Sequence, residues 1–283
     1  MIFFTIRSWH MPSFKVLLVD DDPTALIALR EMLHARFTGV QADVAYSVAT
    51  AFKRVLHTEY DAVVTDVRMP IADGHALLAS VRKVRPHTPV ILISGYGDYA
   101  LALKAMRSGA YDLIQKPIDP DYFCRSLESA VLTYQAQQGR LGAEGRAASA
   151  RPLAELRVLA VDDNPAARLL LARTLASFGA EVLQAGSVVE ALEAIQAHRP
   201  DIVVCDLRLP DEDGYALPRK LSRRLPAEGG RTPLVALTGY PEQEPRHRAL
   251  AAGFRTYLNK DTDPAVIAAV LATVAVGSAN SAG

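Results

Sequence analysis

The strongest constraint on the fold of this chain is an internal repeat that divides it into two similar halves. Four blocks occur twice in the same order: KVLLVDDDP and RVLAVDDNP (15–23, 157–165), AVVTDVRMPIADG and IVVCDLRLPDEDG (62–74, 202–214), PVILISGYG and PLVALTGYP (89–97, 233–241), and DLIQK and TYLNK (112–116, 256–260). In both copies, 22 residues separate the hydroxyl of the third block from the lysine of the fourth. Matched order and spacing predict two copies of one domain, as a length of 283 residues allows.

Each copy alternates short apolar runs with helical patterns. In the first copy, VLLV, ADVA, AVVT, VILI and DLIQ are predicted strands, because they are short, apolar and bounded by Pro, Gly or Asp. Residues 24–37 and 47–60 have helical spacing, and Pro23 suits the first turn of a helix. Five strands alternating with five helices predict an α/β fold, a doubly wound parallel sheet with helices on both faces.

The repeat sets the expected domain boundaries. We expect, in order, an N-terminal extension, a first domain, a linker rich in Gly, Ala and Arg, a second domain and a short disordered tail (1–12, 13–137, 138–154, 155–277 and 278–283). This division leaves no segment for a further domain.

Composition favours a cytoplasmic protein without nucleic-acid or membrane partners. The chain has 31 basic and 31 acidic side chains, so no net charge attracts it to nucleic acid or anionic lipid. Its two cysteines, Cys124 and Cys205, fall in different halves, which fits a reducing compartment. The N-terminus lacks a signal-peptide pattern, and the apolar stretch 264–276 is shorter than the roughly 20 residues that span a bilayer.

Acidic residues follow the first and third predicted strands of both copies. Ligands of doubly wound sheets bind at the carboxyl ends of the strands. The acids expected there are Asp20, Asp21, Asp22 and Asp66 in the first copy, and Asp162, Asp163 and Asp206 in the second. Clustered carboxylates repel one another unless a cation binds, and Mg²⁺ suits a site of oxygen ligands.

A hydroxyl and a lysine complete each cluster. Ser94 and Thr238 end the fourth strands, and Lys116 and Lys260 end the fifth. A carboxylate nucleophile beside a cation, a hydroxyl and an ammonium can carry a phosphoryl group. Any one such residue is more often a helix cap, a turn residue or a solvated charge, so the prediction depends on the complete repeated set.

These motifs resemble those of receiver domains of two-component response regulators, over about 15–137 and 155–276. The resemblance implies a flavodoxin-like strand order and phosphoacceptors Asp66 and Asp206, which take phosphate from the phosphohistidine of a sensor histidine kinase or phosphotransfer protein. It implies Mg²⁺ sites formed by Asp20, Asp21, Asp66 and the Arg68 carbonyl, and by Asp162, Asp163, Asp206 and the Arg208 carbonyl. It also implies switch hydroxyls at Ser94 and Thr238, phosphate-pairing Lys116 and Lys260, and no enzyme activity beyond self-phosphorylation and self-dephosphorylation.

The copies depart from the family pattern at two positions. The aromatic residue expected three positions before the lysine is Tyr257 in the second copy but Leu113 in the first. The Lys-Pro pair of the first copy, whose bond is often cis in the family, is Lys260-Asp261 in the second, where a cis bond would cost about 2.5–4 kcal/mol.

Two bulky positions beside each phosphoacceptor admit two interpretations. Arg68 and Arg208 lie two residues after the aspartates, and Tyr96 and Tyr240 lie two residues after the hydroxyls. They either shield the phosphoaspartate from water or are ordinary residues at the rim.

The last helix, over 264–276, is apolar nearly all round. We expect a partner to cover it, either a second copy in a homodimer or the first domain, through the face of the fourth helix, fifth strand and fifth helix. The alternative is an alanine-rich helix that exposes little area.

Three functions fit the sequence. The first is a stand-alone response regulator with two phosphorylatable receivers that signals through protein contacts. The second is an aspartate-nucleophile phosphatase, for which Asp20 and Asp22 supply a D-x-D pattern that Asn164 interrupts in the second copy. The third is an adaptor or dimerisation module with vestigial sites.

Overall fold

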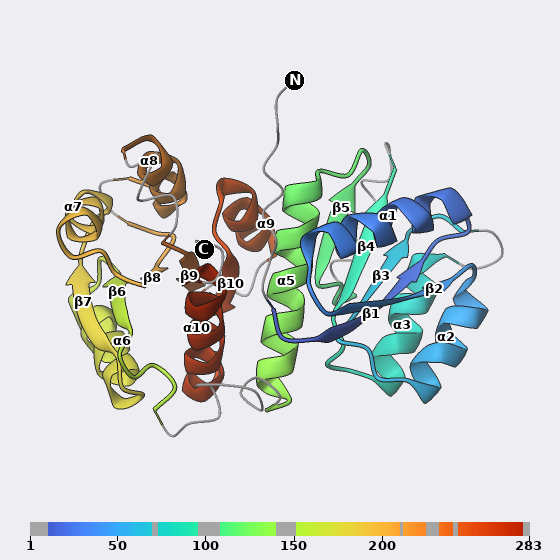
Figure 1. Ribbon diagram of the computed structural model, residues 1–283, viewed down its shortest axis with the longest axis horizontal. Helices are drawn as coiled ribbons and strands as arrows, with labels where there is room; N and C mark the ends of the chain where they lie inside the picture. The colour runs from blue at the N-terminus through green and yellow to red at the C-terminus, as the bar shows by residue number, and fades with distance from the viewer. Residues whose placement is uncertain are drawn as a thin grey trace. The chain divides into compact units, whose positions relative to one another are not determined.

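The computed structural model divides the chain into two compact units, Met1–Gln135 and Ala136–Gly283 (Figure 1). The structure describes residues 11–69, 73–95, 108–139, 151–209, 212–224, 232–239 and 243–279. Most of the predicted N-terminal extension and linker lies outside these residues. No helix in the described part of the chain is long and apolar enough to cross a membrane.

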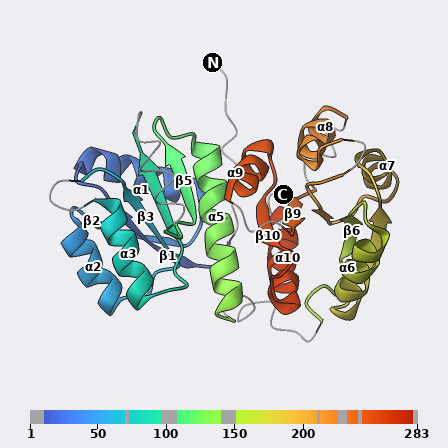
Figure 2. The same ribbon diagram turned by 180° about the vertical axis from the view of Figure 1, so that it is seen from behind.

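Unit 1 is a parallel five-stranded sheet with helices on both faces. Its strand order is β2-β1-β3-β4-β5, as expected for a flavodoxin-like fold. Its described elements are β1 (Phe14–Val19), α1 (Pro23–Arg36), β2 (Val40–Ala45), α2 (Val48–His57), β3 (Ala62–Asp66), α3 (Gly74–Val84), β4 (Val90–Ser94), β5 (Asp112–Gln115) and α5 (Pro120–Gln137). Helices α2 and α3 cover the face of the sheet that is turned toward the viewer in Figure 2. Helix α1 covers the opposite face, which is turned toward the viewer in Figure 1.

Unit 2 repeats this plan with the strand order β10-β9-β8-β6-β7. Its elements are β6 (Arg157–Val161), α6 (Pro165–Ser177), β7 (Glu181–Ala185), α7 (Val188–His198), β8 (Ile202–Cys205), the 3₁₀ helix η2 (Gly214–Ala216), α8 (Leu217–Arg224), β9 (Leu234–Thr238), α9 (Gln243–Ala252), β10 (Thr256–Asn259) and α10 (Pro264–Ala279). The predicted fold class, two doubly wound parallel sheets in tandem, is confirmed.

The central strands are buried on both faces, because helices cover each side of a parallel sheet. Every residue of β3, β4 and β9 is buried, and the side chains there are mainly Val, Ile, Leu and Ala. This explains why these strands read as continuous apolar runs. Polar side chains that act on a ligand can therefore lie only where the strands end.

The first helix of each unit begins at a capping side chain that follows the acidic cluster. Asp22 Oδ1 accepts a hydrogen bond of 2.8 Å from the Thr24 amide, and Asn164 Oδ1 accepts one of 2.9 Å from the Ala166 amide. A proline occupies the first turn in both cases, as predicted. Asp22 is therefore a helix cap, the structural role that a single acid after a strand most often has.

Two segments differ in extent from the sequence-based expectation. Helix α10 ends at Ala279, two residues inside the segment predicted as a disordered tail. Leu153, in the predicted linker, is fully buried, and its amide donates to the Phe178 carbonyl at 3.0 Å. The end of that segment is therefore packed into the core of unit 2.

Candidate functional site

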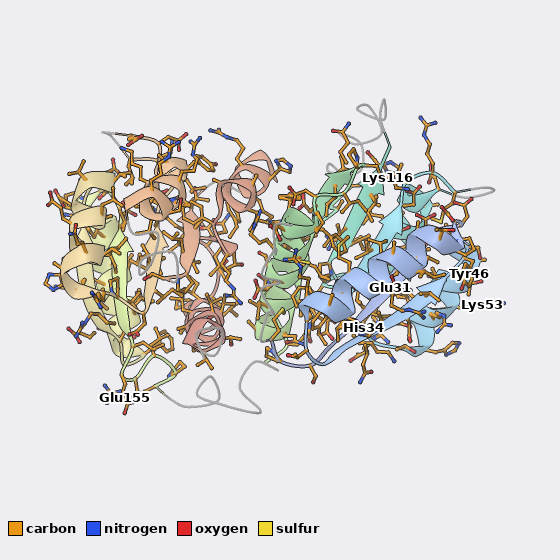
Figure 3. The ribbon with its side chains drawn as sticks, turned by 45° about the horizontal axis from the view of Figure 1, so that its top comes forward. Glu31, His34, Tyr46, Lys53, Lys116 and Glu155 are labelled. Atoms are coloured by element: carbon orange, nitrogen blue, oxygen red, sulfur yellow. The ribbon has the colours of Figure 1, made fainter. Side chains whose placement is uncertain are left out.

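Two carboxylates and a lysine meet at the carboxyl edge of the sheet in unit 1. Asp20 follows β1, Asp66 ends β3 and Lys116 follows β5, and Figure 3 shows Lys116 at this edge. The Lys116 ammonium lies 2.6 Å from Asp66 Oδ1 and 3.6 Å from Asp20 Oδ2. Both carboxylates are buried, with 7% and 5% of their side-chain surface exposed. The ammonium therefore neutralises part of a buried negative charge.

Burial and proximity shift the protonation equilibria of this group. Burial raises the pKa of Asp20, and the nearby charge of Asp66 adds to this effect, whereas the Asp22 amide and Lys116 oppose it. Burial by itself would lower the pKa of Lys116, but its interactions with Asp66 and Asp20 outweigh burial and raise it. Burial thus accounts for the pKa shift of Asp20, and the position of the ammonium between two carboxylates accounts for the pKa shift of Lys116.

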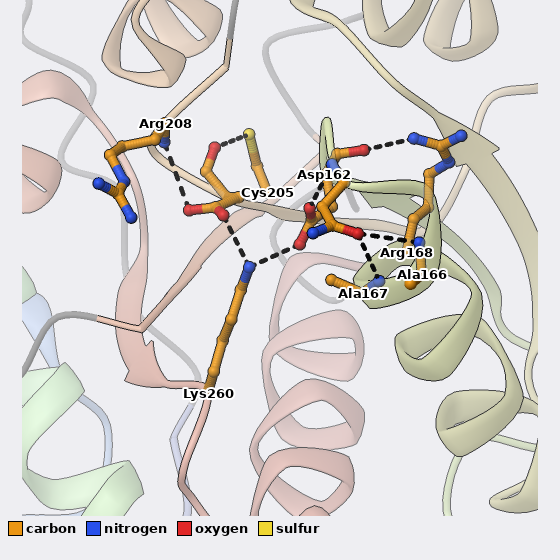
Figure 4. A network of polar contacts seen from close by, with 9 residues as sticks. Asp162, Ala166, Ala167, Arg168, Cys205, Arg208 and Lys260 are labelled. Carbon is orange, nitrogen blue, oxygen red and sulfur yellow. Dashed lines mark hydrogen bonds and ion pairs between the residues drawn. The ribbon is translucent and has the colours of Figure 1, made fainter.

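In the corresponding group of unit 2, the lysine lies close to both carboxylates (Figure 4). The Lys260 ammonium donates to Asp162 Oδ2 at 2.6 Å and to Asp206 Oδ2 at 2.7 Å. Burial would lower the pKa of Lys260, but its bonds to the two carboxylates raise it overall. One ammonium is therefore shared almost equally by two carboxylates.

The donor set fits a hard divalent cation best in unit 2. Oxygen atoms of Asp162, Asp163 and Asp206 lie within 4.8 Å of one another. Carboxylate oxygens at this spacing are ligands that Mg²⁺ accepts. In unit 1, Asp20 and Asp66 share Lys116, but no third carboxylate oxygen lies at this spacing from them among the described residues.

The predicted hydroxyls lie at the same edge. Ser94 and Thr238 are 4% and 2% exposed and end β4 and β9. The carbonyl of Ser94 accepts from the Lys116 amide at 2.7 Å, and that of Thr238 accepts from the Lys260 amide at 2.8 Å. Parallel pairing thus places each hydroxyl residue beside its lysine.

The backbone after each phosphoacceptor candidate turns back toward its carboxylate. The amides of Arg68 and Arg208 donate to Asp66 Oδ2 at 2.7 Å and to Asp206 Oδ1 at 3.3 Å. These bonds orient the two carboxylates. Tyr96 and Tyr240, the other bulky positions considered, lie outside the described residues.

A glycine in each copy, to which the sequence motifs alone assign no role, permits the close approach of this turn. A Cβ on Gly74 would lie 2.4 Å from the Asp66 carbonyl oxygen, and one on Gly214 would lie 2.5 Å from that of Asp206. Any side chain would therefore displace the backbone that carries the aspartate. The signal was present in the sequence, because each glycine follows its aspartate by eight residues.

The two departures from the family pattern are visible in the structure. Tyr257 is buried, with the Arg246 guanidinium 5.4 Å from its ring centre, whereas Leu113 is partly buried. The Lys116-Pro117 bond is cis, and it is the one cis peptide among the described residues.

Parts of this chain are similar to known proteins. The uncharacterized 14.6 kDa protein in the sodA1 3' region of Leptolyngbya boryana is 40% identical over 112 residues, which are 40% of this chain and 84% of that protein. The C4-dicarboxylate transport transcriptional regulatory protein DctD of Pseudomonas aeruginosa is 41% identical over 118 residues, 41% of this chain and 25% of DctD. This chain therefore spans about a quarter of DctD. A crystal structure of a response regulator receiver domain protein from Clostridium thermocellum is 28% identical, with a TM-score of 0.40 over 42% of this chain and 94% of that one.

The family assignment follows from a match in each half. The family model for the response regulator receiver domain matches residues 16–128 and again 158–272. The two matches together cover most of the chain, and each includes one of the two acidic sites. The chain belongs to the response regulator receiver family and carries two receiver domains in tandem.

Proposed function

We propose that both receivers are phosphoacceptors, with Asp66 and Asp206 as the nucleophiles. The observation that carries this proposal is the contact of each aspartate with a lysine ammonium, at 2.6 Å in unit 1 and 2.7 Å in unit 2. A carboxylate oxygen attacks the phosphorus of a phosphohistidine, the bond from phosphorus to the imidazole nitrogen breaks, and an acyl phosphate forms. The ammonium then pairs with the phosphoryl oxygens.

Mg²⁺ is the proposed cofactor of both sites. Asp20, Asp21, Asp66 and the Arg68 carbonyl would hold it in unit 1, and Asp162, Asp163, Asp206 and the Arg208 carbonyl would hold it in unit 2. The cation would neutralise charge on the phosphoryl oxygens. Asp66 Oδ1 is buried, and the Lys116 ammonium lies 2.6 Å from it, whereas Oδ2 accepts from the Arg68 amide.

The hydroxyls of Ser94 and Thr238 are the proposed switch groups. Each ends a buried strand and can donate to a phosphoryl oxygen by a rotation about one bond. The carbonyl of each hydroxyl residue accepts a hydrogen bond from the amide of the lysine after the next strand. A movement of the hydroxyl residue would therefore also move that lysine. This would convert phosphorylation into a change at the surface that a partner recognises.

The proposed partners are a sensor histidine kinase or a phosphotransfer protein upstream and a protein target downstream. Most apolar residues of α10 between Ile267 and Ala275 are buried, and Val276, 44% exposed, is the large apolar side chain of this helix that a target or a second copy of the chain would contact. Size-exclusion chromatography with light scattering, before and after phosphorylation, distinguishes a homodimer from a monomer.

Phosphotransfer tests the proposal. A phosphorylated histidine kinase should label the wild-type chain, and Asp66→Asn and Asp206→Asn should each lose the label of one receiver. If both variants kept the wild-type amount of label, the assignment of the nucleophiles would be wrong.

A phosphatase function predicts a different result. Asp22, the second acid of the D-x-D pattern, caps α1 and is exposed, so nothing in the structure directs it toward a substrate. We therefore expect no turnover of p-nitrophenyl phosphate, whereas steady turnover that needs Asp20 and Asp22 would favour the enzyme.

A further inference from the structure

The acidic loop of unit 2 has a contact that the unit 1 sequence cannot make. Arg168, in the first turns of α6, donates from Nη1 to the Asp162 carbonyl oxygen at 2.6 Å (Figure 4). The carboxylate of the same residue accepts from the Asn164 amide at 3.0 Å and from Lys260 at 2.6 Å. Asp162 is thus fixed on its main chain as well as on its side chain.

A second position makes room for this guanidinium. A Cβ on Gly186, in the turn between β7 and α7, would lie 3.1 Å from Arg168 Nη1. That distance is tighter than most contacts of real Cβ atoms, so a larger residue would require the guanidinium to shift by a few tenths of an ångström. Gly186 has no positive φ angle, so its backbone does not require glycine. The missing side chain instead leaves space for the guanidinium.

The first receiver differs at both positions. Leu26, buried in the core, stands where the second receiver has Arg168, four residues after Asp22 in one copy and four after Asn164 in the other. Tyr46, 54% exposed, stands where the second receiver has Gly186. The arginine and the space it needs therefore occur in the same copy.

We infer that Arg168 is a positioning residue that organises the cation site of the second receiver. By holding the Asp162 carbonyl, it fixes the loop so that Asp162 and Asp163 face Asp206. A ligand loop that is already ordered loses less conformational entropy when a cation binds, so the affinity for Mg²⁺ is higher. The inference depends on the proposed function, because that function supplies the cation.

The sign of the effect separates this role from simple electrostatics. Arg168 is a cation near a cation site, so its charge alone weakens Mg²⁺ binding. Removing an arginine that acts only through its charge therefore strengthens binding. Removing an arginine that positions the loop weakens Mg²⁺ binding. The extra entropy lost by a mobile loop exceeds the gain from removing a repulsion that solvent and salt already screen.

Calorimetric titration of the full chain with Mg²⁺ measures this sign. Asp20→Asn with Asp66→Asn forms the background, so that only the second site binds. In it, we expect Arg168→Leu, which installs the residue of the first copy, to weaken Mg²⁺ binding about 10-fold, as loss of an outer-shell partner does. Gly186→Ala should weaken it less than Arg168→Leu does, because the guanidinium needs to shift only slightly. Arg168→Lys should bind more tightly than Arg168→Leu.

Arg173→Leu is the matched control. Arg173 is exposed on the same helix, so this variant removes the same charge without touching the loop, and its affinity should stay near that of the background. Unchanged or tighter binding in Arg168→Leu would overturn the positioning role and leave the proposed function intact. A background that binds no Mg²⁺ would overturn both.

Discussion

Replacing Lys260 with methionine tests whether its ammonium holds two carboxylates together. Asp162 and Asp206 have 2% and 12% of their side-chain surface exposed, and the ammonium is their shared partner. Loss of one partner of a buried ion pair costs about 3–5 kcal/mol. Because Lys260 keeps 30% of its side-chain surface exposed, solvent screens part of this, and we expect the free energy of unfolding to fall by about 2 kcal/mol without Mg²⁺.

The assay is urea unfolding of the full chain in EDTA and again in saturating Mg²⁺. Mg²⁺ supplies positive charge at the same carboxylates and stabilises the folded state that binds it. The deficit of Lys260→Met should therefore shrink to less than about 1 kcal/mol when the cation is present.

Two other lysines calibrate this measurement. Lys220→Met removes an exposed lysine of the same unit that pairs with Glu212, and should cost less than about 1 kcal/mol in either buffer. Lys116→Met should have a smaller effect than Lys260→Met, because the second carboxylate of unit 1 lies at 3.6 Å and not 2.6 Å. An equal loss for Lys260→Met with and without Mg²⁺ would refute the electrostatic reasoning.

Three further perturbations follow from the structure. Gly74→Ala should destabilise unit 1 by about 2–3 kcal/mol in urea unfolding, because its Cβ would meet the Asp66 carbonyl. Tyr122→Phe should cost about 1–3 kcal/mol, because it removes the hydroxyl that donates to buried Asp112 at 2.5 Å. Burial raises the pKa of the Cys124 thiol from 9.0 to about 12, so between these values only the unfolded thiol ionises, and its contribution to stability should fall as pH rises through that range.

Each of these has a control. Gly139→Ala places a methyl group in open space, so a loss as large as that of Gly74→Ala would contradict the steric reasoning, although its φ of 65° adds some strain. Tyr46→Phe removes the hydroxyl of an exposed tyrosine and should leave stability nearly unchanged. Cys124→Ala should flatten the alkaline decline relative to the wild-type chain, and parallel curves would exclude the thiol as its cause.

The sequence predicted most of the fold, because the signals for it are local and occur twice. Pro23 after the acidic cluster fixed the start of α1, and the run DLIQ coincides with β5. The end of α10 was less predictable. Gly277 has a poor helical propensity, yet the helix continues through it, so local propensity did not determine where the helix ends.

The candidate site was predicted in its parts but not in its asymmetry. Strand ends are ordered by the sheet, so the grouping of Asp66 with Lys116, and of Asp206 with Lys260, followed from topology. The proposed role of Arg168 could not be predicted in this way. Its guanidinium bonds a main-chain carbonyl six residues earlier, and the open space beside it comes from Gly186, in another part of the chain.

Gly74 and Gly214 were within reach of sequence reasoning. Their fixed distance from the aspartates marks a backbone position that excludes a side chain. The exposure of Asp21 could not be predicted from the sequence. Asp20 and Asp21 are adjacent and share one sequence context, and only the turn of the loop buries one and exposes the other.

The most direct test of the central claim is intact-protein mass spectrometry after incubation with acetyl phosphate and Mg²⁺. The wild-type chain should gain two phosphoryl groups, Asp66→Asn and Asp206→Asn should each gain one, and the double variant should gain none. A wild-type chain that stays unmodified, or a double variant that is still phosphorylated, would contradict the assignment of these two aspartates as the phosphoacceptors.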